Sequence, residues 1–412
     1  MKILLCHNYY QEPGGEDAVF ADEAALLTAH GHEVIRYTAH NESIKGMSRW
    51  QVARSTLWNH QSYTDLKALF KSQRPAVLHC TNTFPLVSPA AYYAARAAGV
   101  PVVQSLHNYR LFCVNGLLMR DGHVCETCVG RATAWPGIAH ACYRDSRAAS
   151  AAVAAMQAVH WTLGTWTKMV DLYVALTEFA REKFIAGGLP AKKLVVKPNF
   201  VSPDPGVGDG RGGYAIYVGR LSVEKGIDTL LSAWQKAPAG MKLKIVGDGP
   251  SRDLVRAAAE QNAHVEWLGH LPRPCVQTLI AEAAVLVLPS VCYEGLPKTI
   301  LEAFASGTPV VGARLGGIAA AVKHAETGRL FTPGNAPSLA AEVEHMVANS
   351  DQFAAMRRAA RREFEANYTA QRNYELLMSI YHRAGVKDAT RVPDVVLSSE
   401  HPHHRTQCGV AI

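Results

Sequence analysis

The feature that most constrains the fold of this chain is a regular alternation of short apolar runs with longer helical patterns. The apolar runs are rich in Val, Ile and Leu, as in strands buried on both faces of a parallel sheet. A first series lies at residues 3–6, 34–37, 77–80, 102–106, 172–176 and 194–196, and a second at 215–218, 243–246, 265–268, 285–288 and 310–312. This pattern predicts an α/β protein with two parallel-sheet domains.

The two series are separated by a stretch from Lys197 to Gly213. It is rich in Pro, Gly and Asp, which is typical of a linker. At 412 residues the chain fits two domains of about 200 residues each better than a single core. We predict a first domain at residues 1–200, a second at 201–366, a helix at 367–384 that crosses back to the first domain, and a mobile tail at 385–412. The tail contains His401, His403 and His404, to which we assign no function.

The composition is that of a globular protein, with 48% hydrophobic and 19% charged residues. The net charge of +7 favours phosphate-rich ligands or an anionic membrane face, but no nucleic-acid-binding motif accompanies it, so we predict no nucleic-acid partner. No apolar run reaches the roughly 20 residues that span a bilayer, and the start MKILLC lacks the features of a signal peptide. We therefore expect a cytoplasmic protein, soluble or peripheral on the inner membrane face, with reduced, metal-bound or buried cysteines.

Two cations lie in a loop after the first strand of the second series. The strand at 215–218 is followed by GRLSVEKG at 219–226, in which Arg220 and Lys225 stand between flanking glycines. Because parallel sheets bind ligands where their strands end, and because glycine allows close approach of the backbone, we expect both cations to converge on one anion. The alternative is a pair of solvated surface cations.

Two glutamates follow the strand at 285–288 in the same domain. Pro297 suits the first turn of a helix, which places Glu294 in the preceding loop and Glu302 on the helix, up to about 12 Å apart. One carboxylate is then placed to meet a sugar and the other a ribose, while the amides from Gly295 onward point toward a phosphate. In isolation, two glutamates at this spacing are also typical of a solvent-exposed helix.

These segments together resemble the retaining glycosyltransferases of family 4, which have the GT-B fold. The resemblance extends over nearly the whole chain to about residue 384. It is carried by GRLSVEKG at 219–226, VGDGP at 246–250, WLGHL at 267–271, PSVCYEGLPKTILEAFASGTPVV at 289–311 and LGG at 315–317. It implies an α/β GT-B fold, with two facing Rossmann-like domains, a deep cleft between them, and the donor site mainly in the second domain.

The resemblance also implies roles for individual residues. Arg220 and Lys225 would bind the donor diphosphate, Glu294 the donor sugar and Glu302 the ribose. Fixed cations stabilise the charge that develops on a departing diphosphate without a metal, and no Asp-x-Asp motif is present, so we expect no catalytic cofactor. The other residues implied in donor or substrate binding are Gly14, Gly15, Gly219, Asp248, Leu268, His270, Gly295 and Leu296.

In the first domain the resemblance points to the glycine pair in EPGGEDAV and to a histidine. Gly14 and Gly15 would let the backbone approach the donor phosphate or the acceptor; the alternative is a tight turn. His107 ends the strand at 102–106 and would face the reacting sugar. It would either take the acceptor proton or only hydrogen-bond a donor hydroxyl while the leaving phosphate takes that proton.

A Cys-rich insertion at about 113–142 lies outside the common core of the family. Cys113, Cys125, Cys128 and Cys142 supply four thiols, two of them in a CxxC pair, which predicts a structural zinc site. His123 or His140 would be able to replace one ligand, and the alternative is four independent reduced thiols. Similar segments occur in a subset of these transferases. We expect the insertion to shape the acceptor site.

The sequence thus predicts a retaining, metal-independent hexosyltransferase that moves a sugar from a nucleotide diphosphate sugar, a UDP- or GDP-sugar, to a hydroxyl acceptor. Cell-surface polysaccharide or lipid-linked glycan synthesis is the expected setting, with a glycan or lipid-linked acceptor. Two alternatives remain at this point, a nucleotide-sugar 2-epimerase-like isomerase and a catalytically silent nucleotide-sugar-binding protein. A nicotinamide dehydrogenase is disfavoured because no GxGxxG follows either domain's first strand.

Overall fold

The first domain is built on a six-stranded parallel sheet. The computed structural model describes residues 1–12, 14–387 and 389 of the chain. The strand order is β2-β1-β3-β4-β7-β8, and every pairing is parallel. The strands are β1 (Lys2–Tyr9), β2 (Glu33–His40), β3 (Val77–Asn82), β4 (Val102–Leu106), β7 (Leu172–Ala175) and β8 (Leu194–Val196).

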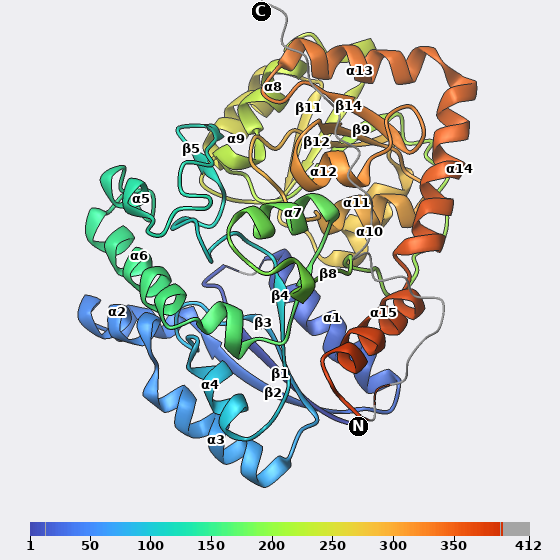
Figure 1. Ribbon diagram of the computed structural model, residues 1–412. Helices are drawn as coiled ribbons and strands as arrows, with labels where there is room; N and C mark the ends of the chain where they lie inside the picture. The colour runs from blue at the N-terminus through green and yellow to red at the C-terminus, as the bar shows by residue number, and fades with distance from the viewer. Residues whose placement is uncertain (13, 388, 390–412) are drawn as a thin grey trace, which may run out of the picture.

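Helices cover both faces of this sheet (Figure 1). On one face, side chains of β1 and β3 pack with Phe20 and Leu27 of α1. On the other face, β1, β3 and β4 pack with Leu66 and Phe70 of α3 and with α4 and α6. The helices are α1 (Gly15–Ala29), α2 (Arg49–Leu57), α3 (His60–Gln73), α4 (Ala90–Ala97), α5 (Trp135–Ala139), α6 (Arg147–Thr162) and α7 (Glu178–Ala186).

The second domain repeats this architecture. Its sheet has the order β11-β10-β9-β12-β13-β14, again with parallel pairings throughout. The strands are β9 (Tyr214–Val218), β10 (Lys242–Val246), β11 (Val265–Gly269), β12 (Val285–Leu288), β13 (Val310–Ala313) and β14 (Gly328–Phe331). The helices are α8 (Ile227–Trp234), α9 (Arg252–Gln261), α10 (Arg273–Glu282), α11 (Lys298–Ala305), α12 (Gly316–Ala321), α13 (Ala336–Ala348) and α14 (Ser350–Asn367). The prediction of two parallel-sheet, Rossmann-like domains is therefore confirmed.

The last helix, α15 (Ala370–Arg383), packs on the first domain although it follows the second in sequence (Figure 1). Its Leu377 and Tyr381 lie in the same apolar cluster as residues of β1 and α1. A buried ion pair accompanies this contact, because Lys197 Nζ donates to Glu23 Oε1 at 2.7 Å and to Asn373 Oδ1 at 3.1 Å. The linker, α1 and α15 are thus joined by polar as well as apolar contacts.

The structure bears on two further expectations, the C-terminal tail and the lack of a membrane-spanning helix. Of the tail expected from residue 385, only 385–387 and 389 belong to the described residues, so the His401, His403 and His404 patch lies outside them. Among the helices that the structure describes, none has the length and apolar composition needed to cross a membrane.

Candidate active site

The loops after β4 and β7 of the first domain touch the loop after β12 of the second. A Cβ atom added to Gly295 would lie 3.6 Å from the His107 carbonyl oxygen and 3.3 Å from Leu176. Thr177 Oγ1 also donates to the Gly295 carbonyl at 3.4 Å. These contacts bring His107 and the loop that carries Glu294 to one place, where the carboxyl ends of both sheets meet.

An ion pair between Lys225 and Glu294 lies at the carboxyl-end edge of the second domain's sheet. Lys225 Nζ donates to Glu294 Oε1 at 2.6 Å, and Ser290 Oγ donates to the same oxygen at 2.8 Å. Burial alone would lower the pKa of Lys225, but the acidic groups around it, Glu294 first and then Cys292 and Glu224, together outweigh burial and raise that pKa above its usual value. The lysine is therefore a fixed cation, placed beside the carboxylate that the sequence assigned to the donor sugar.

Glycines hold the loops of this edge against one another. A Cβ on Gly247 would lie 1.9 Å from the Gly219 carbonyl oxygen, and one on Gly226 would lie 2.0 Å from the Pro289 carbonyl oxygen. A Cβ on Gly317 would lie 1.9 Å from the Gly295 carbonyl oxygen. The glycines of GRLSVEKG, VGDGP and LGG are thus needed because backbone passes directly over backbone.

Arg220 and Lys225 pair with different carboxylates in this structure, and their convergence on one bound anion stays a prediction. The Arg220 guanidinium pairs with Glu12 of the first domain at 3.1 Å, and both side chains are largely exposed. Arg220 thus forms an ion pair with the first domain, whereas Lys225 forms one within the second domain. For both cations to bind one ligand, that ligand would have to replace Glu12 and Glu294 as their partners.

Glu302 lies on α11, as the sequence predicted, in a partly buried group of charges between the domains. Arg273 Nε lies 3.9 Å from its Oε1. Asp22 of α1 accepts from both Arg273 and Lys298, which links the first domain to this group. Burial raises the pKa of Glu302, and the two cations oppose that rise only in part.

The other second-domain residues of the predicted donor site lie on loops at the ends of β9, β10 and β11 and before α11. Asp248 is exposed, and its carbonyl accepts from the Leu221 amide at 2.9 Å, which ties VGDGP to GRLSVEKG. His270 is exposed after β11, Leu268 is half-buried on that strand, and Leu296 is buried just before α11. The structure places Asp248, His270 and Gly219 on the same edge of the sheet as Lys225.

His107 follows β4 and has an unpaired ring nitrogen. Its Nε2 is buried without a hydrogen-bond partner among the described residues. Burial lowers the pKa of His107 to about 4. The imidazole is therefore neutral at physiological pH, able to donate or accept a hydrogen bond but weak as a proton acceptor.

A cavity of about 60 Å³ opens beside His107 in the first domain. Polar and aromatic side chains line it together, among them Thr83, Phe84, Tyr92 and Arg110. Arg110 is held by carbonyls of the Cys-rich insertion, donating to Val114 O at 2.7 Å and to Asn115 O at 3.1 Å. The insertion thus positions one wall of this cavity.

Gly14 caps the N-terminus of α1 and Gly15 is its first residue, at the same edge. Neither adopts the left-handed conformation, and a Cβ on either would meet no atom within 4 Å. The tight-turn alternative is therefore not needed to explain them. The open space beside them leaves room for a ligand to approach the backbone.

Sequence reasoning missed a polar cluster next to these glycines. Tyr10 Oη donates to Glu16 Oε2 at 2.7 Å, and Asn108 Nδ2 lies 3.4 Å from the tyrosine oxygen. The signal was present, because Glu16 directly follows the glycine pair and Asn108 directly follows His107. Their proximity depends on the sheet order, which the sequence does not state.

The four thiols of the insertion do not form a metal centre in this structure. They lie near the antiparallel hairpin of β5 (Met119–Arg120) and β6 (His123–Val124). Burial raises the pKa of Cys128, and the neighbouring Cys113, Cys125 and Cys142 add to that rise, so the thiols are gathered. Cys113 nonetheless donates to Asn115, and within the described residues no group of three or more His, Cys, Asp or Glu side chains is arranged to hold a metal.

Zinc binding stays a prediction, which metal analysis of the wild type and of Cys125→Ser checks. Equal zinc content in both, or none in either, would leave the four thiols without that role.

Two glycosyltransferase family models match the chain, one in each domain. Residues 14–199 match the glycosyl transferase 4-like domain, and residues 212–349 match the glycosyl transferases group 1. Between them they span the described site from Gly14 to Gly317.

The chain is similar to a glycogen synthase of Mycobacterium tuberculosis, with 35% identity over 35% of this chain and 36% of that protein. It is also similar to the sulfoquinovosyl transferase SQD2 of Arabidopsis thaliana, with 27% identity over 71% of this chain and 54% of that protein. The chain thus spans about a third to a half of the length of these relatives.

Among solved structures, the fold is similar to that of Anabaena HepE in complex with UDP and glucose. The TM-score is 0.65 at 18% identity, covering 93% of this chain and all of that chain. This likeness concerns the fold. With a glycosyltransferase domain on each of its two facing sheets, the chain belongs to the glycosyltransferases of the GT-B fold.

Proposed function

We propose that this protein is a retaining, metal-independent glycosyltransferase that moves a hexose-type unit from a UDP- or GDP-sugar to a hydroxyl acceptor. The observation that carries the proposal is the Lys225–Glu294 pair at 2.6 Å, at the meeting point of the two sheets. It combines a fixed cation for a diphosphate with a carboxylate for sugar hydroxyls. The UDP and glucose bound by Anabaena HepE, as its description states, support a nucleotide sugar as donor.

The charges of the site fit the departure of a nucleoside diphosphate. When the bond between the sugar and the diphosphate breaks, negative charge grows on the phosphate oxygens. Lys225 is in place to stabilise that charge, and Arg220 reaches it once a ligand replaces Glu12 as its partner. Glu294 is then released from Lys225 and accepts hydrogen bonds from the sugar, while Glu302 binds the ribose.

His107 completes the site from the first domain. Its neutral imidazole hydrogen-bonds a donor hydroxyl through the Nε2 atom that now lacks a partner. Such a bond fixes the sugar against the first domain and orients its anomeric carbon toward the acceptor. The acceptor, a glycan or lipid-linked glycan, enters from the side of Gly14, Gly15 and the cavity beside His107.

Neither alternative has an observation in its favour. The relatives include a lipopolysaccharide galactosyltransferase of Salmonella typhimurium, with 29% identity over 40% of this chain and 49% of that protein. A silent binding protein does not require a fixed lysine, a paired carboxylate and an unpaired histidine at one place. Synthesis of cell-surface or lipid-linked glycans is the setting we propose.

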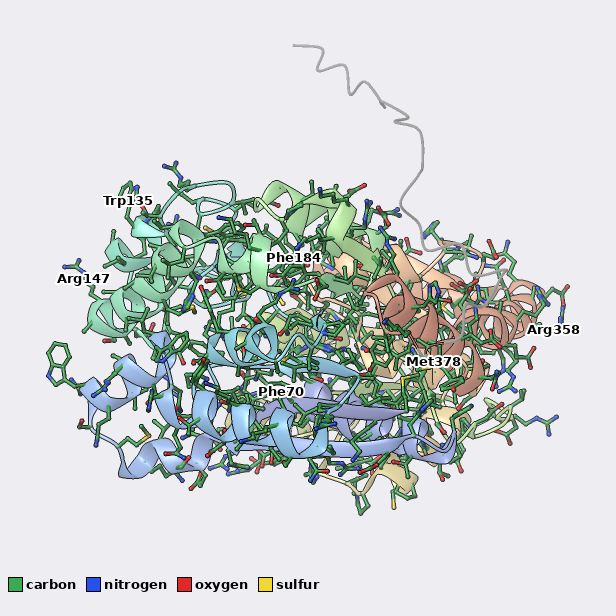
Figure 2. All side chains as sticks on the ribbon, turned by 60° about the horizontal axis from the view of Figure 1, so that its bottom comes forward. Phe70, Trp135, Arg147, Phe184, Arg358 and Met378 are labelled. Carbon is green, nitrogen blue, oxygen red and sulfur yellow. The ribbon has the colours of Figure 1, made fainter. Side chains whose placement is uncertain are left out.

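We also propose that the first domain contacts the inner membrane face. Trp50 of α2 is 87% exposed and Trp135 of α5 is 58% exposed, and both helices pack against α6. Figure 2 shows Trp135 and Arg147 at the same end of the molecule. Further exposed arginines on these segments are Arg49, Arg54, Arg131 and Arg144. Exposed indoles among cations are typical of a surface that binds an anionic bilayer.

The donor test is thermal stabilisation of the wild type by UDP, GDP, ADP and their sugar conjugates, with a chelator present. A ligand that binds only the folded protein raises the melting temperature by mass action. We expect stabilisation by one nucleotide class despite the chelator, followed by release of that nucleotide on turnover. Absence of stabilisation by every nucleotide would contradict the proposal, and stabilisation that EDTA abolishes would contradict metal independence.

Retention of configuration is tested on the donor identified in this way. Proton NMR of the first sugar product should show the same anomer as the donor, before mutarotation mixes the two. The opposite anomer would make the protein an inverting transferase.

Membrane contact is tested by sedimentation with vesicles of phosphatidylglycerol and phosphatidylcholine. We expect binding that Trp50→Ala combined with Trp135→Ala weakens at least tenfold. Equal binding by the double variant would contradict the proposed surface.

A further inference from the structure

A carboxyl group at the start of α1 is not used by the function proposed so far. Glu16 Oε2 accepts a hydrogen bond from Tyr10 at 2.7 Å, but its Oε1 is buried without a partner among the described residues. A buried carboxylate oxygen without a partner costs free energy, so a missing partner is expected at this position. Glu16 directly follows Gly14 and Gly15, where an added Cβ would meet no atom within 4 Å.

A hydrogen-bonded route and the polypeptide chain itself connect this carboxyl group to the rest of the site. Through Tyr10 it reaches Asn108, which directly follows His107. Through the loop that precedes α1 it is connected to Glu12, which pairs with Arg220 of the second domain. Glu16 therefore stands on the acceptor side of the site, with the donor loop across the interface.

The surroundings of Glu16 raise its pKa to about 7. Burial is the largest cause and Asp17 adds to it, whereas hydrogen bonds from Tyr10 and Asn108 and the charge of Arg110 lower the pKa. These groups come from α1, from the loop before it and from the loop after β4. Glu16 is thus divided between its acid and its base forms near neutral pH, which suits a general base.

His107 is less suited to that task. Its pKa of about 4 makes the neutral imidazole a much weaker proton acceptor than a carboxylate with a pKa of about 7. The structure thus separates two tasks that the sequence left to one residue. His107 is fitted to hold a hydroxyl, and Glu16 to take a proton.

We propose that Glu16 is a catalytic residue that binds the attacking hydroxyl of the acceptor through Oε1 and takes up its proton. The acceptor oxygen forms the new bond to the anomeric carbon, and the bond from that carbon to the diphosphate oxygen breaks with its electron pair. The proton moves from the acceptor to Glu16 Oε1 and passes to water when the products leave. The inference rests on the proposed transferase function and adds the acceptor half of its site.

The test uses the full chain, with water as the acceptor probe and UDP-glucose or GDP-mannose as the donor, whichever nucleotide class stabilises the wild type. We expect Glu16→Gln to lower kcat for donor hydrolysis by about 10² to 10⁴ fold. The nucleotide-induced rise in melting temperature should stay unchanged, because donor binding does not use Glu16. Glu42→Gln, in an exposed pair with Lys45, is the matched control and should keep wild-type activity.

The pH profile separates a base from a merely structural residue. In the wild type, kcat/KM should rise with pH through an inflection near 7, and Glu16→Gln should lose that rise. Tyr10→Phe removes a hydrogen bond that favours the carboxylate, so it should move the inflection to higher pH while turnover continues. This second variant keeps the test informative if Glu16→Gln does not fold.

Several outcomes would overturn the inference. Activity of Glu16→Gln within threefold of the wild type, or an inflection unmoved in Tyr10→Phe, would leave Glu16 with a packing role. A wild type that binds nucleotide but hydrolyses no donor would also contradict it, since a base at this place activates water as well. Failure of nucleotide binding in the wild type is a different result, because it overturns the transferase function itself.

Discussion

The two facing sheet edges differ in how completely their polar groups are paired. On the second domain's edge, Lys225, Glu294 and Ser290 bond to one another, and glycines let the supporting loops touch backbone to backbone. On the first domain's edge, His107 Nε2 and Glu16 Oε1 have no described partner, and Gly14 borders open space. We infer that the donor side is organised before the ligand arrives, whereas the acceptor side is completed by its ligand.

The largest expected effect on activity comes from a substitution in the hydrogen-bonded edge of the second domain. Glu294→Gln removes the anion beside Lys225 and one set of hydrogen bonds to the donor sugar. We expect kcat/KM to fall by about 10² to 10³ fold, as for other preorganised polar groups. Initial-rate measurements with the identified donor check this. Glu326→Gln, which removes an exposed partner of Lys323, serves as control, and an equal loss there would point to a general defect.

Substituting a glycine on each edge should change the stability of the protein by different amounts. In Gly317→Ala the new Cβ would overlap the Gly295 carbonyl oxygen, so we expect a loss of about 3 kcal/mol in the free energy of unfolding. Gly14→Ala meets no atom and should change that free energy by less than about 1 kcal/mol. Thermal unfolding of both variants measures the difference. Equal destabilisation would remove the contrast in backbone packing.

The raised pKa of Glu16 predicts how the stability of the protein depends on pH. That pKa is about 7 in the folded protein and near 4.5 in the unfolded chain, so the folded state holds the proton more tightly. The stability it contributes is complete below pH 4.5 and is lost as the pH rises through 7. Relative to the wild type, Glu16→Gln should therefore be more stable at pH 8 than at pH 4, by up to about 3 kcal/mol.

Denaturation at the two pH values measures this shift. Glu42→Gln, at an exposed position, should show no such change with pH. A pH-independent effect of Glu16→Gln would mean that its carboxyl is paired or solvated, and the contrast between the edges would weaken.

The smallest effect is expected for the exposed pair that joins the edges. Glu12→Gln breaks the contact with Arg220, and exposed ion pairs contribute less than about 1 kcal/mol. The change in melting temperature should be small in low salt and vanish in high salt. A large, salt-independent loss would show that the domains depend on this pair.

The fold was predictable because buried parallel strands leave a strong local pattern. The apolar runs at 102–106 and 310–312 correspond to β4 and β13 within one residue. β14 was missed because GRLF is short and contains both a glycine and an arginine, and the hairpin of β5 and β6 because each strand has only two residues.

The site was predictable only in part. Glu302 was placed on its helix because Pro297 marks where α11 begins. The pairing of Arg220 with Glu12 was not predictable, since it depends on how the domains face each other. The same holds for Tyr10, Glu16 and Asn108, which come together only through the order of strands in the sheet.

The central claim is that Lys225 and Glu294 form the donor site, and titration calorimetry tests it most directly. The identified nucleotide should be titrated, with EDTA present, into the wild type, Lys225→Ala and the control Lys323→Ala, whose lysine lies in an exposed pair with Glu363. The account predicts equal dissociation constants for the wild type and the control, and binding at least tenfold weaker for Lys225→Ala. Equal affinity in all three proteins would contradict it and would place the nucleotide elsewhere.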